Sequence, residues 1–120
     1  MTADPFTDRL ARVRDRFAST LAAKIDDTCA GIARLAQTAP EAAGAVEQAY
    51  RSIHGIVGVG RTVGFPATGQ AAHQVEDVLR PSYQTQRGMT VDELSLLTTA
   101  LQALRETAAR ELKSFQAPQQ

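Results

Sequence analysis

Apolar side chains recur every three or four residues along four separate stretches of this 120-residue sequence. That spacing places them on one face of an α-helix, so the pattern predicts amphipathic helices that pack against one another. The expected helices span about residues 7–37, 39–62, 66–80 and 91–116. No stretch alternates apolar and polar residues over a strand's length, and the connections are short. The predicted fold class is therefore all-α, an antiparallel up-down four-helix bundle.

Turn and capping signals indicate where these helices begin and end. Segments 38–41 (Thr-Ala-Pro-Glu) and 90–93 (Thr-Val-Asp-Glu) both have the spacing of a capping box, which favours a helix start. Gly64 is expected to break the second helix, and Pro66 to begin the third. Pro81 is expected to end the third helix, because a proline in a helix interior removes a backbone hydrogen bond.

Charge and composition exclude several classes of protein. Thirteen basic and thirteen acidic side chains cancel, so no overall field would recruit nucleic acid or an anionic membrane. No apolar stretch approaches membrane-spanning length, and the first residues lack the basic region and apolar run of a signal peptide. Cys29 is the only cysteine, so no internal disulfide can form, and a reduced, cytoplasmic setting is expected. The length predicts one domain, residues 1–120, that needs no metal or disulfide for stability.

The stretch 50–65 combines a histidine with several glycines. His54 lies beside the apolar stripe of the second predicted helix, on a polar face. Gly55, Gly58 and Gly60 fall inside the same helix, where each glycine costs roughly 1 kcal/mol relative to alanine. Close approach by a neighbouring helix or by a partner's backbone would offset that cost. Gly58, one turn after His54, would leave the surface beside the imidazole clear.

His54 is the candidate reactive residue. A neutral imidazole is nucleophilic at physiological pH and can form a covalent intermediate. The alternative interpretation is a surface histidine on a helix whose glycines serve tight packing. His73, the second histidine, precedes Glu76 by three residues, so these two side chains can touch. For His73 we expect a structural pairing or plain exposure, with little effect on the chemistry of His54.

Two other kinds of site are not predicted. The two histidines have no cluster of cysteines or carboxylates that would complete a recognisable metal-ligand set. The glycine-rich segment 58–64 superficially suggests a phosphate-binding loop. A dinucleotide fingerprint needs a preceding strand and a different glycine spacing, and the Walker motif needs Gly-Lys-Ser/Thr. Neither is present, so nucleotide binding is rejected.

Three short motifs carry a family resemblance. They are the run His54-x-Ile56-x-Gly58, the run Val63-Gly64-Phe65-Pro66 and the pair Val75-Glu76. In this order they resemble histidine phosphotransfer (HPt) domains, whose pattern is roughly His-x-Leu-Lys-Gly, then Leu-Gly-Leu-Pro, then a Leu-Glu pair. The spacings match without a gap, and the resemblance covers about residues 8–115. Val57 departs from the pattern, because the family usually carries a lysine three residues after the histidine.

The resemblance implies a phosphocarrier of two-component signal transduction. His54 would accept a phosphoryl group from an aspartyl phosphate on a response-regulator receiver domain and pass it to another receiver. Glu76 matches the family's acidic or amide position and would orient the imidazole. Gly58 would leave room for the partner. Arg61 and Arg80 could pair with the phosphorylated histidine, although each could equally be ordinary solvated surface.

The same resemblance implies receiver domains and a histidine kinase as partners, with the catalytic Mg²⁺ held by the partner. The chain would be a monomeric phosphotransfer intermediate rather than a turnover enzyme, with no cofactor, nucleic acid or membrane of its own. Two alternatives stay open. Valine at position 57 would leave a small apolar surface on the exposed side of His54, as in a docking module that binds a receiver or kinase as inhibitor or scaffold without carrying phosphate. A protein that dimerises through the glycine face is the second alternative.

Overall fold

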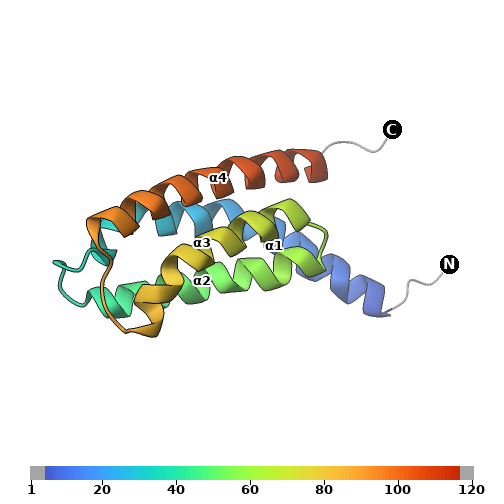
Figure 1. The fold of residues 1–120 in the computed structure, drawn as a ribbon. Coiled ribbons are helices and arrows are strands. Elements are labelled where there is room, and N and C mark those ends of the chain that lie inside the picture. The colour runs from blue at the N-terminus through green and yellow to red at the C-terminus, as the bar shows by residue number, and fades with distance from the viewer. Residues whose placement is uncertain (1–4, 117–120) are drawn as a thin grey trace.

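Four α-helices follow one another in the computed structural model, which describes residues 5–116 (Figure 1). They are α1 (Pro5–Ala30), α2 (Ala42–Thr62), α3 (Pro66–Gln84) and α4 (Val91–Gln116), with a short 3₁₀ helix, η1 (Ile32–Leu35), after the first. Over these residues there is no strand, only an isolated bridge between Ala36 and Met89. The all-α prediction is confirmed. No helix in the described part of the chain is long and apolar enough to cross a membrane.

The two longest helices, α1 and α4, run side by side in opposite directions (Figure 1). In the first half of α1, the Arg14 guanidinium lies 5.5 Å from the centre of the Phe115 ring, at the end of α4. Towards the other end of α1, Asp26 accepts a 2.9 Å hydrogen bond from Arg105, nearer the middle of α4. From Arg14 to Asp26 along α1, the contacts therefore move backwards along α4, from Phe115 to Arg105. Two neighbouring helices of an up-down bundle require this antiparallel arrangement.

A single cluster of buried apolar side chains lies between the helices, and all four contribute to it. The side chains come from positions three or four residues apart, which is why the periodicity of the sequence could predict them. The most completely buried large members within the helices are Leu21 and Ile25 of α1, Val46, Ile53 and Ile56 of α2, Val75 and Leu79 of α3, and Leu97, Leu101 and Leu104 of α4.

Helices α2 and α3 pack most closely, and two glycines allow it. A Cβ on Gly60 would lie 3.6 Å from the Cα of Gly69 and 3.4 Å from the Phe17 ring. A Cβ on Gly69 would lie only 2.8 Å from Cγ of Arg61. The Arg61 side chain can therefore pass over α3 at Gly69 because this residue has no side chain. Close helix packing therefore accounts for Gly60, one of the four glycines inside α2.

The start of α3 is capped from another helix. Gly64 makes the preceding turn with φ +96°, and the N-cap residue Phe65 provides no side-chain hydrogen bond. Instead the Glu111 carboxylate, near the end of α4, accepts hydrogen bonds from the N–H groups of Ala67 (3.2 Å) and Thr68 (2.6 Å). A negative charge is favourable at this end of a helix, so α4 stabilises α3 and holds the two helices antiparallel.

The first helix ends at Ala30 instead of continuing to about residue 37. Beyond it, the N–H of Met89 donates to the carbonyl of Leu35 at 2.7 Å, and the N–H of Gln37 donates to the carbonyl of Met89 at 2.9 Å. Backbone groups that pair with this distant loop cannot also continue a helix. Gly88 permits the contact, since a Cβ there would overlap the backbone of Gln37.

The second helix starts at Ala42 rather than at residue 39, and the capping box predicted for segment 38–41 is wrong. The N–H of Ala39 donates to the carbonyl of Ala36 at 2.8 Å, which makes a turn of this segment. Glu41, the N-cap residue, has φ 58° and no side-chain capping bond. Because the preceding backbone is tied to Met89, the geometry that a capping box needs is not reached.

The capping box at the start of α4 is confirmed. The N–H of Thr90 donates to Glu93 Oε1 at 2.9 Å, and the N–H of Glu93 donates to Thr90 Oγ1 at 3.2 Å. Arg87 adds two hydrogen bonds to the same carboxylate, at 2.8 and 3.0 Å. The guanidinium and the Thr90 N–H lower the pKa of Glu93 to about 2, so the carboxylate is ionised across the physiological range.

The third helix continues past Pro81 to Gln84, so the expected stop at this proline is wrong. Proline removes one helical hydrogen bond, to the carbonyl of Asp77. Both Pro81 and Asp77 lie on the exposed side of α3, where water can replace that bond. The carbonyl of Pro81 still accepts from the N–H of Thr85 at 3.1 Å. The extra turn brings Tyr83 alongside α2.

Candidate functional site

His54 lies in the second half of α2 with most of its imidazole in solvent. Its side chain is 67% exposed, as a residue that reacts with a partner protein requires. Gly58, one turn later, is also exposed, and a Cβ built there would meet no other atom within 4 Å. Gly58 therefore leaves the surface beside the imidazole open and, unlike Gly60, has no role in close helix packing.

The other side of the imidazole is held by Glu76 on α3. Glu76 Oε2 is in hydrogen-bonding contact with His54 Nδ1, and the glutamate side chain is only 5% exposed. A carboxylate can only accept hydrogen bonds, so Nδ1 must carry the proton. The second ring nitrogen, Nε2, then has a free lone pair and is the nucleophilic atom. The predicted contact between these two residues is confirmed.

Glu76 is charged despite its burial. Burial by itself raises the pKa of this carboxyl group, because a charge is costly in an apolar environment. Hydrogen bonds from His54 and His73 and the positive charge of Arg80 outweigh that effect, and the net result is a lowered pKa. A buried carboxylate therefore lies next to Nδ1 at neutral pH, where it can stabilise positive charge that develops on the ring.

Arg80 completes this cluster from one turn further along α3. Its Nη2 lies 3.4 Å from Glu76 Oε1, and its Nη1 pairs with Asp77. Hydrogen bonds to Asp77 and to Tyr50 of α2 raise the pKa of Arg80. Through Glu76, which contacts His54, Arg80 is also linked to α2.

The two arginines on α2 itself point to other partners. Arg61 Nη2 donates to Oε1 of Gln70 on α3 at 3.3 Å, and Arg51 pairs with Glu47 at 3.4 Å. Both arginines are exposed. Of the predicted cations, Arg80 is the one that the fold joins to the carboxylate of the site, whereas no contact links Arg61 to His54.

Two tyrosines, Tyr50 on α2 and Tyr83 on α3, extend the site, and the sequence analysis assigned a role to neither of them. Tyr50 stacks on His54 with 6.0 Å between ring centres and 10° between planes. On its other side Tyr50 stacks on Tyr83 of α3, at 4.0 Å and 7°. The spacing of four residues between Tyr50 and His54 was a usable signal, because such residues are neighbours on a helix. The sequence contained no comparable signal for Tyr83.

Val57 is buried, which corrects the expectation that it lies on the exposed side of His54. It is 8% exposed and belongs to the apolar core cluster. The reason is its direction on the helix: three residues after His54, the chain has turned back towards α3, and the Val57 carbonyl would lie 3.5 Å from a Cβ on Gly69. The residue in the family's lysine position thus packs between α2 and α3.

His73 touches Glu76, as predicted. Its Nδ1 lies 3.3 Å from Glu76 Oε1, and its Nε2 lies 3.8 Å from Asp77 Oδ2. The two imidazoles of the chain therefore meet the two oxygens of one carboxylate. Across residues 5–116, no group of three or more histidine, cysteine or carboxylate side chains is placed to hold a metal ion.

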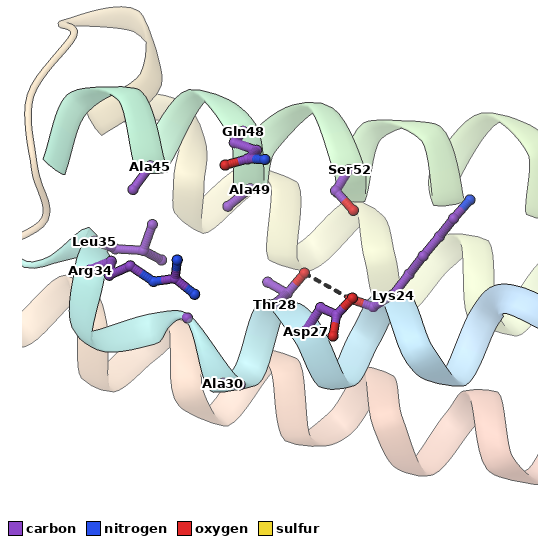
Figure 2. Close-up of a pocket in the computed structure, with 11 residues that line it drawn as sticks. Lys24, Asp27, Thr28, Ala30, Arg34, Leu35, Ala45, Gln48, Ala49 and Ser52 are labelled. Carbon is purple, nitrogen blue, oxygen red and sulfur yellow. Dashed lines mark hydrogen bonds between the residues drawn. The ribbon is translucent and has the colours of Figure 1, made fainter. Parts of the chain in front are cut away.

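A separate hollow of about 440 Å³ lies between the end of α1, η1 and the first half of α2 (Figure 2). Lys24, Asp27 and Arg34 are on its lower side, and Gln48 and Ser52 come from α2 above. None of the residues of the His54 cluster lines it. The His54 cluster therefore lies outside this hollow, and its imidazole is on open surface.

Comparison with known protein families finds a match to the model described as Hpt domain, over residues 12–107. Neither the curated proteins nor the solved structures include a significant match. Hpt domains are helical phosphocarriers that transfer phosphoryl groups through a histidine in phosphorelays, and the four helices and the exposed His54 agree with that role. The matched residues cover most of the chain, and the chain therefore belongs to the Hpt domain family.

Proposed function

We propose that this protein carries a phosphoryl group on Nε2 of His54. The group comes from the aspartyl phosphate of a receiver domain and passes on to the aspartate of a second receiver. A single observation carries the proposal: an exposed imidazole whose Nδ1 is held by a buried, ionised glutamate. That contact sets the tautomer in which Nε2 is the nucleophile.

The reaction is a simple displacement at phosphorus. The Nε2 lone pair of His54 attacks the phosphorus, the new P–N bond forms, and the P–O bond to the receiver's aspartate breaks with its electrons on the carboxylate. The ring keeps its Nδ1 proton and becomes positively charged. Glu76 already accepts a hydrogen bond from Nδ1 and balances that charge, in the way that a buried carboxylate stabilises an imidazolium in other sites. Return of the phosphoryl group to an aspartate reverses every step.

The surface around His54 suits a docking partner. Gly58 leaves open space next to the ring, Tyr50 offers an aromatic face, and the exposed guanidinium groups of Arg51 and Arg61 can form a charged rim. The receiver would contribute its acidic pocket and its Mg²⁺. The protein would then be a monomeric, single-domain intermediate in the cytoplasm, with receiver domains and a histidine kinase as partners and no turnover activity of its own.

A second candidate function rests on Val57. Where the family usually has a lysine, this chain has a buried valine, so no cation extends from that position towards the phosphoryl group. The protein could then bind a receiver or kinase as an inhibitor or scaffold without accepting phosphate. The intact His54–Glu76 contact favours the phosphocarrier, because a docking module has no use for a prepared nucleophile.

The deciding experiment uses a receiver domain that carries a radioactive phosphoryl group on its aspartate. Incubation with this protein should move the label to the protein. The label should be lost in acid and kept in base, as expected for a phosphohistidine. An aspartyl phosphate, by contrast, is lost in base. His54→Gln should take no label, whereas His73→Gln should still be labelled. A receiver that binds tightly while wild-type protein stays unlabelled would instead support the docking module.

A further inference from the structure

The carboxylate of Glu76 is shared between two imidazoles. Its Oε2 contacts Nδ1 of His54 on α2, and its Oε1 lies 3.3 Å from Nδ1 of His73, one turn earlier on α3. Arg80, one turn later, contacts the same Oε1 at 3.4 Å. One oxygen therefore faces the candidate nucleophile, while the other is held by two residues of its own helix.

The proton positions follow from the acceptor. Glu76 is ionised and can only accept, so His73 also donates through Nδ1. A carboxylate rotates about its last bond unless both oxygens are held, and this torsion has no strong preference of its own. The two contacts to Oε1 stop that rotation and leave Oε2 directed at His54. His73 provides the shorter of these contacts.

We propose that His73 is a positioning residue for His54, acting through Glu76. By donating to Oε1 it fixes the orientation in which Oε2 holds the Nδ1–H tautomer of His54 and keeps Nε2 free. This positioning of His54 is a property of the unphosphorylated protein. Its consequence for phosphoryl transfer rests on the proposed function. The inference goes against the sequence-based expectation that His73 has little effect on the chemistry of His54.

Loss of the His73 donor should weaken the alignment without unfolding the helix. His73 is only partly buried, and its backbone hydrogen bonds do not depend on the side chain. A free imidazole in water prefers the Nε2–H tautomer, in which Nε2 cannot attack. His54 should therefore shift towards that tautomer. If the lost alignment corresponds to the free energy of one hydrogen bond, phosphoryl transfer should slow by about two- to tenfold.

Two variants separate this role from a structural one. His73→Leu removes the donor, whereas His73→Asn places an amide nitrogen where Nδ1 was. Asparagine and histidine have similar helix propensities, and leucine has a higher one, so neither change should unfold α3. Nitrogen-15 NMR of the His54 ring reports which ring nitrogen carries the proton. Transfer of label from a phosphorylated receiver to the protein is timed on the same samples.

We expect the His54 Nε2 resonance to move towards the protonated position in His73→Leu and to stay near the wild-type position in His73→Asn. Transfer should slow in the first variant and not in the second. Wild-type His54 resonances in His73→Leu would overturn the inference, and so would a His73→Asn protein that behaves like His73→Leu. If wild-type protein takes no label, the proposed function fails, and the NMR comparison still decides the role of His73.

Discussion

Nδ1 of His54 on α2 is in contact with Oε2 of Glu76 on α3, a residue that lies 22 positions further along the chain. The histidine is largely exposed and the glutamate is buried. The pair thus joins a surface histidine to a charge inside the bundle, and the packing of α2 on α3 would set the geometry of the proposed reaction.

Glu76→Gln tests the charge in this pair, since the amide oxygen can still accept from Nδ1. We expect phosphoryl transfer to slow by about fivefold, because a charge-assisted hydrogen bond exceeds a neutral one by roughly 1 kcal/mol. Glu76→Ala, which also removes the acceptor, should slow transfer further. Rates are measured at saturating receiver, with circular dichroism to verify the fold. Wild-type rates in Glu76→Gln would mean that the carboxylate charge plays no part.

Gly58→Ala should improve stability and impair docking. The added methyl group points into open space, so the helix should gain about 1 kcal/mol in free energy of unfolding. The same methyl lies where a receiver must approach His54, so the Kd for the receiver should rise. Gly44→Ala on the same helix is the control, because its Cβ is equally unobstructed but lies far from His54. Unchanged or tighter receiver binding by Gly58→Ala would contradict the proposed docking face.

Val57→Lys should have two opposite effects. The valine is buried, so a longer side chain must be accommodated, at a cost of about 1–3 kcal/mol in free energy of unfolding. If the ammonium group reaches the surface near His54, an exposed attraction of about 0.2–1 kcal/mol would raise the phosphorylated fraction at equilibrium, up to about fivefold. Urea unfolding and label content measure these separately.

Val57→Met is the matched variant, since it is also long but carries no charge. It should lose some stability without any increase in label. If Val57→Lys remains unlabelled and also loses receiver binding that the wild-type protein shows, the docking module becomes the better account.

Stability should fall in acid partly because of Glu93. Its pKa is lowered to about 2 in the folded protein, chiefly by Arg87, against an ordinary value of 4.5. A carboxyl group with a lowered folded pKa stabilises the protein above its unfolded pKa, and that contribution disappears as the pH falls from about 5 towards 2. At pH 7, Glu93→Gln should lose about 1.5–3 kcal/mol, the usual range for hydrogen bonds to a charged group.

The measurement is urea unfolding of wild-type protein and Glu93→Gln at a series of pH values. The difference between the two should shrink below pH 5. A difference that stays constant down to pH 3 would show that the carboxylate charge contributes nothing to the helix start.

Local patterns in the sequence were enough for the helix class and for two helix starts, those at Pro66 and Val91. A period of 3.6 residues puts the apolar positions on one face whatever the helix packs against, so four helices and most core residues followed directly. The capping box of Thr90 and Glu93 was predicted correctly because its hydrogen bonds join residues three apart. The similar signal at segment 38–41 failed because nearby backbone pairs with Met89, a residue far away in sequence.

For the candidate site, the sequence pointed to His54 and to open space at Gly58, and its resemblance to HPt domains pointed to Glu76 as the residue that contacts the ring. Only the tertiary structure decided that Val57 is buried, that Tyr83 stacks on Tyr50, and that His73 and His54 meet at one carboxylate. The physical reason is the difference between interactions that are local in sequence and those between distant residues. Helical periodicity determines which residues share a face, whereas the packing of α2 on α3, close enough to need Gly60 and Gly69, determines which faces meet.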